Sequence, residues 1–427
     1  MIETYWHSVT LDRELCKGCT NCLKHCPTQA IRVQNGKAKI LKERCIDCGE
    51  CIRVCPYHAK KAVADSLDML EGFKYNVALV APAFYGQFSK TENIDIILSA
   101  LLDLGFDDVF EVARGAQVIT EKTKELLASG QLLKPAISSA CPAVLRLIAI
   151  KFPNLIANIV PLKSPMEISA DQARREAVEK TGLSADEIGI FFISPCAAKA
   201  TFVKGSYTVK KSDVDGVIPI KDICIKMSRT VSKIADKNVK NLRNAGRSGV
   251  IWATSGGEAE TSGAERYIAV DGIHNVINVF EEVDDGKLSD VDYIEALACS
   301  GGCVGGPLTA ENSFSAKSKI QRICRHIDDE MMPFDENMNM FWDESIVYRP
   351  IMNLDPDITV AMQKMSMIEE IYEGFPKLDC GSCGSPSCRA LAEDIVRGYA
   401  KETDCIFKLR EKISELTRDM LELENRD

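Results

Sequence analysis

The 427-residue sequence is poor in histidine, in tryptophan and in long apolar segments. Its five histidines are too few for a His-rich metal enzyme, so any metal chemistry must use other ligands. No apolar run approaches the roughly 18 residues of a membrane-spanning helix. The richest runs, NVALVAPAF and PAVLRLIAI, are too short or are interrupted by Arg146. We therefore expect no transmembrane segment and no membrane partner.

The charge balance is also informative. The chain has 62 acidic and 52 basic residues, a net charge of -10, whereas nucleic-acid-binding surfaces are basic. A nucleic-acid partner is therefore not expected. The N-terminal segment MIETYWHSV has neither the basic nor the apolar region of a signal peptide, so we expect a cytoplasmic protein.

Cysteine is abundant, with 18 residues. The length allows about two to four domains, and 46% hydrophobic residues can build large cores without disulfides. In a reducing compartment, clustered cysteines are metal ligands or redox groups more often than crosslinks. Their spacing therefore becomes the main source of information.

Two copies of the motif C-x2-C-x2-C-x3-C-P lie near the N-terminus. In bacterial two-cluster ferredoxins, three cysteines of each run hold one 4Fe-4S cluster and the fourth ligates the other cluster. One predicted cluster uses Cys16, Cys19, Cys22 and Cys55, and the other uses Cys45, Cys48, Cys51 and Cys26. The alternative is a pair of zinc sites, but zinc prefers two C-x2-C pairs separated by a longer loop.

A third cysteine group lies near the C-terminus and comprises Cys380, Cys383, Cys388 and Cys405. Three of these cysteines lie in a Gly/Ser/Pro-rich loop, and the fourth follows a predicted helix with the sequence RALAEDIVRGYA. The group resembles the small 4Fe-4S domain of the CO dehydrogenase/acetyl-CoA synthase corrinoid protein, which implies a third accessory cluster. A zinc knuckle is the alternative.

The middle of the chain, from about residue 75 to 330, alternates apolar runs with amphipathic stretches. This pattern predicts parallel sheets covered by helices, in which functional sites gather at the carboxyl ends of the strands. Four cysteines follow apolar runs and could converge there: Cys141, Cys196, Cys299 and Cys303. The alternative is that they are buried structural cysteines, which is the role we expect for Cys224 and Cys324.

Three segments of this region resemble the signatures of the FeFe-hydrogenase H-cluster domain, in the same order and at similar separations: SSACPAV (138–144), SPCAAK (194–199) and ALACSGGCVGG (296–306). The resemblance implies an α/β domain of two lobes with parallel sheets flanked by helices. It also implies an H-cluster, in which a 4Fe-4S cubane is bridged to a diiron unit with CO, cyanide and azadithiolate. The implied ligands are Cys141, Cys196, Cys299 and the bridging Cys303.

The same resemblance implies which residues surround the diiron unit. Lys199 matches the family lysine that donates a hydrogen bond to a cyanide, and the segment WATSGG (252–257) matches a pocket loop. The other implied pocket residues are Pro82, Ala83, Ser164, Pro165, Met166, Ser194 and Leu297.

Several positions depart from the pattern of catalytic members. Ala140 stands where those members have a cysteine that relays protons from the amine bridge. Ser194 and Leu297 replace two methionines that flank the diiron unit, and Met166 replaces a glutamine. Because groups around a metal site tune its potential and deliver protons, these changes predict slow turnover with the cofactor retained. They resemble the divergent members regarded as sensory hydrogenases.

The predicted function is therefore a low-turnover oxidoreductase that cleaves H2 into protons and electrons and senses H2 or redox state. A ferredoxin-like redox partner, diiron maturation factors and a signalling partner are expected. One alternative is an iron-sulfur electron carrier or scaffold without the diiron unit. Another is a bulk hydrogenase whose protons pass through acids such as Glu121, Glu125 or Glu258.

The predicted domains are a small α+β ferredoxin-like domain (1–70), an H-cluster domain (71–365), a small C-terminal iron-sulfur domain (366–405) and a terminal amphipathic helix (406–427). In that helix, apolar residues recur at spacings of three and four: Ile406, Leu409, Ile413, Leu416, Met420 and Leu423. This spacing is typical of a coiled-coil seam and predicts a homodimer; a helix docked on its own domain is the alternative.

Overall fold

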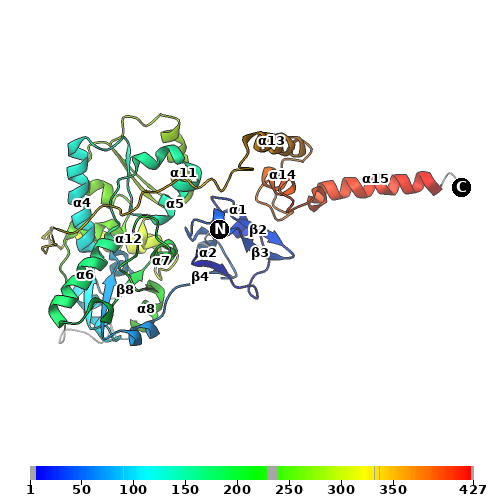
Figure 1. Ribbon diagram of the computed structural model, residues 1–427. Coiled ribbons are helices and arrows are strands. Elements are labelled where there is room, and N and C mark those ends of the chain that lie inside the picture. Colours follow the sequence, from blue (N-terminus) through cyan, green and yellow to red (C-terminus); the bar gives the residue numbers. More distant parts are fainter. Residues whose placement is uncertain (1–5, 90, 228–238, 331, 336, 425–427) are drawn as a thin grey trace. The chain divides into compact units, whose positions relative to one another are not determined.

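The computed structural model describes residues 6–89, 91–227, 239–330, 332–335 and 337–424 (Figure 1). The predicted first and last domains therefore include residues, 1–5 and 425–427, that lie outside the described ones. The chain forms two compact units. One comprises Met1–Val9, Ile46–Gly49 and Ala62–Arg349, and the other comprises Thr10–Cys45, Glu50–Lys61 and Pro350–Asp427. Most of the ferredoxin-like segment thus shares a unit with the C-terminal segments.

The first unit contains two parallel sheets. The larger has the strand order β6-β5-β8-β9, with β5 at Tyr75–Val80, β6 at Asp108–Glu111, β8 at Ile188–Ser194 and β9 at Gly216–Pro219. Alternate residues of these strands enter different cores, as Ile193 and Phe192 do. Because both faces are covered, β8 is buried along its whole length, which explains its uninterrupted apolar sequence.

The smaller sheet has the parallel order β10-β11-β7, with β7 at Ala136–Ile137, β10 at Tyr267–Asp271 and β11 at Tyr293–Leu297. Helices flank the sheets, so the predicted α/β class is confirmed (Figure 1). Their bounds are α3 Ile94–Leu102, α4 Val112–Ser129, α5 Pro142–Lys151, α6 Pro165–Thr181, α7 Ala197–Lys204, α8 Ile220–Met227, α9 Arg247–Val250, α10 Gly257–Thr261, α11 Ile273–Asp284 and α12 Ser313–Cys324.

Helices α4 and α6 cross at a very short distance. A Cβ atom added to Gly115 on α4 would lie 2.7 Å from the carbonyl oxygen of Pro165 and would also overlap the hydroxyl of Ser169. Glycine is therefore required at this crossing. Because α6 begins at Pro165, the close approach also fixes the position of its first residues.

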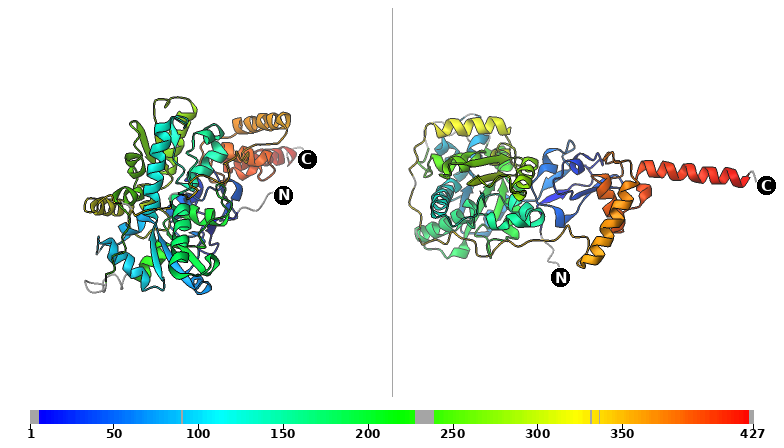
Figure 2. Two further views of the ribbon diagram at one scale, coloured as in Figure 1. Left: turned by 60° about the vertical axis from the view of Figure 1, so that its left-hand side comes forward. Right: turned by 90° about the horizontal axis from the view of Figure 1, so that it is seen from above.

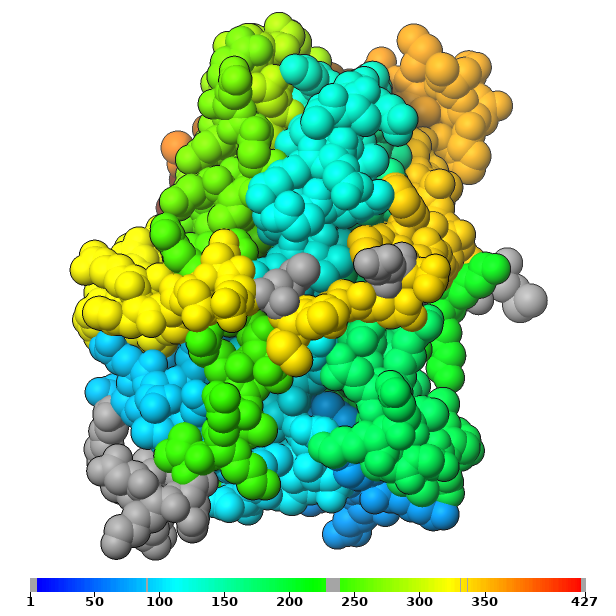
Figure 3. All heavy atoms as spheres, turned by 90° about the vertical axis from the view of Figure 1, so that its left-hand side faces the viewer, coloured from blue at the N-terminus to red at the C-terminus, as the bar shows by residue number. Residues whose placement is uncertain are grey.

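The segment after α12 returns across the first unit as an extended strap, described at residues 326–330, 332–335 and 337–349 and coloured yellow to orange in Figure 3. The amide of Lys163 donates a hydrogen bond to the carbonyl of Met340 at 2.7 Å. The amide of Asp343 donates one to the carbonyl of Thr208 at 2.8 Å. The strap thus joins the loop that precedes α6 to the loop that follows α7.

The second unit combines a small hairpin with the C-terminal helices (Figures 1 and 2). The antiparallel hairpin consists of β2 Ile31–Gln34 and β3 Lys37–Ile40, and short strands β1 Val9–Leu11 and β4 Lys60–Ala62 also pair. The helices are α1 Asn21–Lys24, α2 Glu50–Arg53, α13 Ile358–Glu373, α14 Cys388–Val396 and α15 Ile406–Glu424. None of the described helices combines the length and the apolar character that crossing a bilayer requires.

Candidate functional site

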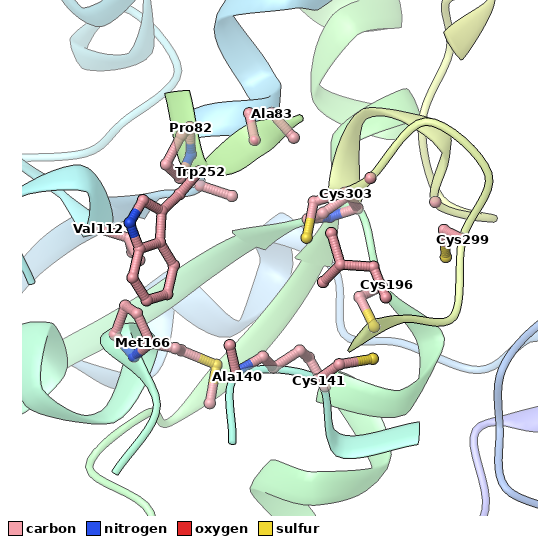
Figure 4. A pocket seen from close by; sticks show the side chains of 18 of the residues that line it. Pro82, Ala83, Val112, Ala140, Cys141, Met166, Cys196, Trp252, Cys299 and Cys303 are labelled. Carbon is pink, nitrogen blue, oxygen red and sulfur yellow. The ribbon is translucent and has the colours of Figure 1, made fainter. Parts of the chain in front are cut away.

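A cavity in the first unit brings together most of the residues predicted from the sequence (Figure 4). It lies beyond the carboxyl ends of strands from both sheets, the usual place for a site in parallel sheets. Its empty space amounts to about 840 Å³, counting the open mouth. The predicted residues that line it are Pro82, Ala83, Ala140, Cys141, Pro165, Met166, Cys196, Lys199, Leu297, Cys299 and Cys303.

The four cysteines approach the cavity from three loops. Cys141 is the N-cap of α5, with Pro142 at its first position, and Cys196 is the N-cap of α7. Cys299 follows β11, and Cys303 begins the short 3-10 helix Cys303–Gly305. Free amides and the dipole at a helix N-terminus stabilise a nearby anion such as a thiolate. Figure 4 shows all four on the same side of the cavity.

The donor set fits a metal cluster. Burial, reinforced by the neighbouring Cys141, raises the pKa of Cys196 to about 11, and burial raises the pKa of Cys303 well above its usual range. Thiolates are therefore unfavourable in this cavity unless a cation compensates them. Iron would supply that positive charge, and clusters of iron and sulfide, like zinc ions, are common partners of four cysteine thiolates.

Lys199 brings a second polar group to the cavity wall. Burial lowers the pKa of Lys199, while the nearby Cys196 and Glu167 act in the opposite direction. Glu167 accepts a hydrogen bond from the hydroxyl of Ser212 at 2.8 Å, and burial raises its pKa to about 7. Sequence reasoning missed this acid, although it follows Met166 directly in the segment KSPME.

Ala140 presents a methyl group to the cavity, and a buried polar network lies behind it. Its amide donates to the hydroxyl of Ser138 at 3.2 Å, and that hydroxyl donates to Glu258 at 2.7 Å. Tyr293 donates a second hydrogen bond to Glu258 at 2.6 Å, and burial raises the pKa of the carboxyl group. Because Glu258 also lines the cavity, a titratable group reaches the site close to the alanine.

Two predicted pocket residues, Ser164 and Ser194, are buried but are not among the residues that line the cavity. Ser164 is the N-cap of α6, and the hydroxyl of Ser194 donates to the carbonyl of Cys196 at 3.3 Å. Two candidate acids, Glu121 and Glu125, form ion pairs with lysines on the exposed face of α4. Of the three acids considered, the structure places Glu258 at the cavity.

The wall opposite the cysteines was only partly predicted. Trp252 belongs to the expected segment WATSGG, and its indole N–H donates to Thr120 at 3.0 Å. Val112 and Phe192 also line the cavity, but nothing in the sequence pattern indicated them. The uninterrupted apolar sequence of β8 marks Phe192 as buried without revealing which face of the sheet borders a site.

The second unit contains seven of the eight ferredoxin-type cysteines. One small cavity is lined by the predicted set Cys16, Cys19, Cys22 and Cys55. In the other predicted set, Cys26 and Cys45 lie close enough to Cys51 to raise its pKa, although burial is the larger cause. Cys48 lies in the segment Ile46–Gly49, which belongs to the first unit.

The C-terminal cysteines also converge. Cys388 at the start of α14 and Cys405 just before α15 belong to one buried core, and Cys383 packs against it. Cys380 lies close enough to raise the pKa of Cys383, although burial is the larger cause.

The remaining two cysteines lie away from these groups, on helices of the first unit. Cys224 packs against the main core and Cys324 is part of it. Burial raises their pKa values to about 12 and about 11, respectively, which keeps both thiols neutral. These positions agree with the structural role expected for them.

Three family models match the chain. The model described as "Iron only hydrogenase large subunit, C-terminal domain" matches residues 74–267 and 259–307. A 4Fe-4S dicluster domain matches residues 8–56, and an Fe-S cluster family matches residues 375–407. The prediction of iron-sulfur cofactors is thereby confirmed.

Curated relatives are hydrogenases at low identity. The periplasmic [Fe] hydrogenase large subunit of Nitratidesulfovibrio vulgaris is 27% identical over 362 residues, 70% of this chain and 86% of the relative. Iron hydrogenase 1 of Clostridium pasteurianum is 26% identical over 291 residues, 55% of this chain. The chain spans only 50% of the length of that relative.

Solved structures support the fold. The HydA1 [FeFe]-hydrogenase of Chlamydomonas reinhardtii, as a glutamate variant, superposes with a TM-score of 0.52 at 15% identity, covering 67% of this chain and 98% of that one. HydA(deltaEFG), from a study of stepwise H-cluster assembly, gives a TM-score of 0.53 at 16% identity with the same coverage. At such identities the likeness establishes the fold alone.

The substitution Glu167→Gln tests the burial of the acid beside Lys199. Burial raises the pKa of Glu167 from 4.5 to about 7, so the native state binds its proton more tightly than the unfolded state does. The free energy of unfolding therefore falls as the pH rises through this window. Between about pH 6 and pH 8, the free energy of unfolding should fall by about 1 kcal/mol more for the wild type than for Glu167→Gln. Anaerobic urea denaturation measures this difference.

Glu125→Gln, on the exposed face of α4, is the matched control and should follow the wild type across this pH range. Parallel stability curves for the wild type and Glu167→Gln would contradict the expected effect of burial.

Proposed function

Because the chain belongs to the iron-only hydrogenase large-subunit family, whose model matches more than half of it, we propose that it is a hydrogenase that cleaves H2 reversibly and heterolytically. The observation that carries the proposal is the convergence of four cysteines and Lys199 on one largely apolar cavity. The proposed role is to sense H2 or redox state at low turnover. Ala140, which offers no proton-carrying group to the cavity, supports the low turnover.

The proposed cofactors are an H-cluster and three accessory 4Fe-4S clusters. The cubane of the H-cluster would be held by Cys141, Cys196, Cys299 and Cys303, with Cys303 bridging to the diiron unit. When bound, the diiron unit would supply a Lewis-acidic metal and an amine base for the cleavage of H2. The accessory clusters would be held by the two crossed ferredoxin sets and by Cys380, Cys383, Cys388 and Cys405.

The protein would position the cofactor and keep its surroundings dry. Lys199 would donate a hydrogen bond from its ammonium group to a cyanide ligand. Pro82, Val112 and Trp252 would exclude water from the far side of the cavity, which strengthens the remaining electrostatic interactions. Met166 and Leu297 would shape the wall without offering a proton donor.

Proton delivery would pass through Glu258 in place of the missing cysteine. Its carboxyl oxygen Oε1 accepts hydrogen bonds from Ser138 and Tyr293, and its raised pKa favours exchange of a proton near neutral pH. A carboxyl group placed behind a methyl group is a less direct donor than a thiol at the site. This arrangement therefore agrees with slow turnover.

Electron and protein partners follow from the same proposal. Electrons would leave through the accessory clusters to a ferredoxin-like redox partner. Separate maturation factors would insert the diiron unit, and a signalling partner would read the output. A carrier or scaffold without the diiron unit remains the competing function, but Lys199 and the water-excluding wall would have no evident role in it.

Infrared spectroscopy of protein matured anaerobically provides the decisive test. We expect CO and cyanide stretching bands, together with H/D exchange under H2 at a rate well below that of a bulk hydrogenase. Cys303→Ser, which removes the proposed bridging ligand, should lose the bands while the ferredoxin-type clusters remain. Well-loaded protein without these bands would rule out the hydrogenase in favour of the carrier.

Glu258→Gln tests the proposed proton path. Glutamine can still accept the hydrogen bonds of Ser138 and Tyr293, but it cannot exchange a proton at Oε1. We expect unchanged CO and cyanide bands and an H/D exchange rate reduced by about 10²- to 10⁴-fold, the usual range for loss of a general acid or base. The control Glu121→Gln, at an exposed ion pair, should retain the wild-type rate.

The terminal helix α15 supports the proposed homodimer. Its seam residues remain 42–63% exposed, so no described part of the chain covers them: Ile406, Leu409, Ile413, Leu416, Met420 and Leu423. In heptad terms, Ile406 and Ile413 occupy a positions and the three leucines occupy d positions. Isoleucine at a with leucine at d favours a parallel two-stranded coiled coil. The proposed partner of this face is therefore a second copy of the chain.

Leu416→Asp places a charge at the centre of the seam and should convert the dimer into a monomer. The measurement is molar mass by light scattering during anaerobic gel filtration. Arg418→Asp, on the opposite face of the same helix, is the matched control and should remain dimeric. A wild-type protein that is monomeric at micromolar concentration would exclude this dimer.

A further inference from the structure

The second unit contains a buried ion pair between segments that are far apart in the sequence. Arg32 on β2 donates from Nε and Nη2 to the two carboxylate oxygens of Asp394 on α14, at 2.5 and 3.0 Å. The side chains of this pair are only 5% and 9% exposed. Ser385 donates a further hydrogen bond to Asp394 at 3.0 Å. This fork therefore fixes the C-terminal iron-sulfur domain on the ferredoxin-type hairpin.

A second ion pair lies beside the first. Arg44 pairs with Glu393, the neighbour of Asp394 on α14, and Arg397 donates to the same carboxylate at 2.8 Å. Burial disfavours the charge on Glu393, but the two arginines outweigh burial and lower the pKa of Glu393. Ionised acids on α14 thus meet arginines of the ferredoxin-type segment at two consecutive positions.

The backbone makes an even closer contact next to the cysteines. The amide of Val33 on β2 donates to the carbonyl of Gly384 at 2.8 Å. Gly384 directly follows Cys383, it has a φ of +83°, and any Cβ atom there would collide with the backbone of Val33. The side chain at position 33 also lines the cavity of Cys16, Cys19, Cys22 and Cys55. Val33 therefore lies between the C-terminal cysteine group and the first ferredoxin-type group.

A neighbouring contact joins the same two groups. A Cβ atom on Gly381 would lie 3.4 Å from the Lys24 side chain and 3.5 Å from that of Leu23. Gly381 follows Cys380, and Leu23 follows Cys22. The positive charge of Lys24 is one of the groups that lower the pKa of Cys380, after the hydrogen bonds to Ser382. The loop that holds Cys380 and Cys383 thus abuts the first ferredoxin-type group at both Gly381 and Gly384.

A purely stabilising role would not explain why the contact uses buried charges. Removing two charges from water costs nearly as much as their attraction returns, so buried ion pairs add little net stability. Their attraction depends on geometry, and a forked arginine-carboxylate pair holds its partners in a single orientation. The forked pair of Arg32 and Asp394 therefore suits a contact that must hold the C-terminal domain in one orientation on the ferredoxin-type hairpin.

We propose that the C-terminal iron-sulfur domain is a stage of the electron path, docked by the Arg32–Asp394 fork so that its cluster exchanges electrons directly with the cluster on Cys16, Cys19, Cys22 and Cys55. In each step one cluster loses an electron and is oxidised, while the other gains it and is reduced. No bond or proton moves. The inference rests on the accessory clusters of the proposed function but not on the diiron unit.

The test uses the full chain with its iron-sulfur clusters reconstituted anaerobically, without the diiron unit, and reduced with dithionite. Electron paramagnetic resonance then reports whether neighbouring reduced clusters interact. Cys388→Ser removes one ligand of the C-terminal cluster. With that cluster lost, the signal of the cluster on Cys16 should narrow, and its spin relaxation should slow several-fold.

Arg32→Met removes the docking fork but no ligand. Its iron content should equal that of the wild type, while the spin relaxation of the cluster on Cys16 should slow as it does in Cys388→Ser. Asp394→Asn removes the other half of the fork and should act in the same way. Arg389→Met, which breaks an exposed ion pair with Glu369 on the other side of the C-terminal domain, should match the wild type.

Unchanged relaxation in Cys388→Ser, with one cluster's iron lost, overturns the proposal even if the arginine variant does not fold. Unchanged relaxation in both fork variants, with full iron content, overturns the role of the fork. Because the sample has no diiron unit, neither result depends on the infrared test of hydrogenase function. Failure of that test therefore leaves the electron path between these two clusters to be decided separately.

Discussion

Thiolate charge in a dry interior is the constraint on which the first unit depends. Four cysteines line one cavity, and burial raises the pKa of two of them, Cys196 and Cys303, which disfavours their ionised forms. A 4Fe-4S cluster would relieve this cost, but only if the four cysteines surround one cavity, so that each thiolate can hold a different corner of the cubane. The fold achieves this by placing three loops beyond the strand ends of two parallel sheets, with α5 and α7 starting at Cys141 and Cys196. The close crossing of α4 and α6 at Gly115 fixes the start of α6, where Pro165 and Met166 line the same cavity.

The second unit meets the same constraint by different means. Backbone amides of Ala38 and Ala59 donate to the sulfur atoms of Cys16 and Cys55, at 3.5 and 3.3 Å. Lys60 is only 2% exposed, lines the cavity of this cysteine group, and acts to lower the pKa of Cys22, although burial outweighs it. The short motif therefore supplies amides and one buried cation locally. The residues that line the large cavity of the first unit come from segments spread along the chain.

The separation of a site's residues along the sequence explains which of them could be predicted. The ligand sets of the short motifs follow from spacing alone, and the crossing of Cys26 and Cys55 between the two clusters follows from a known pattern. The convergence of Cys141, Cys196, Cys299 and Cys303 could be predicted because each follows an apolar run, and their role in an H-cluster was implied only by the resemblance of their segments to the FeFe-hydrogenase signatures. The opposite wall could not, because Val112 and Phe192 look like any other buried residues in a strand or helix. Glu258 could be separated from Glu121 only by burial, which depends on how α10 packs beneath Ser138.

The division of the chain into units was hidden from the sequence for the same reason. The fork between Arg32 and Asp394 joins residues 362 positions apart, and neither residue is a predicted ligand. The docked domain also leads directly into the C-terminal helix. Cys405 is buried in the core of that domain, and its carbonyl accepts a hydrogen bond from the amide of Leu409 in the first turn of α15. The C-terminal cluster of the proposed electron path would thus be held in part by Cys405, the residue directly before the proposed dimer helix.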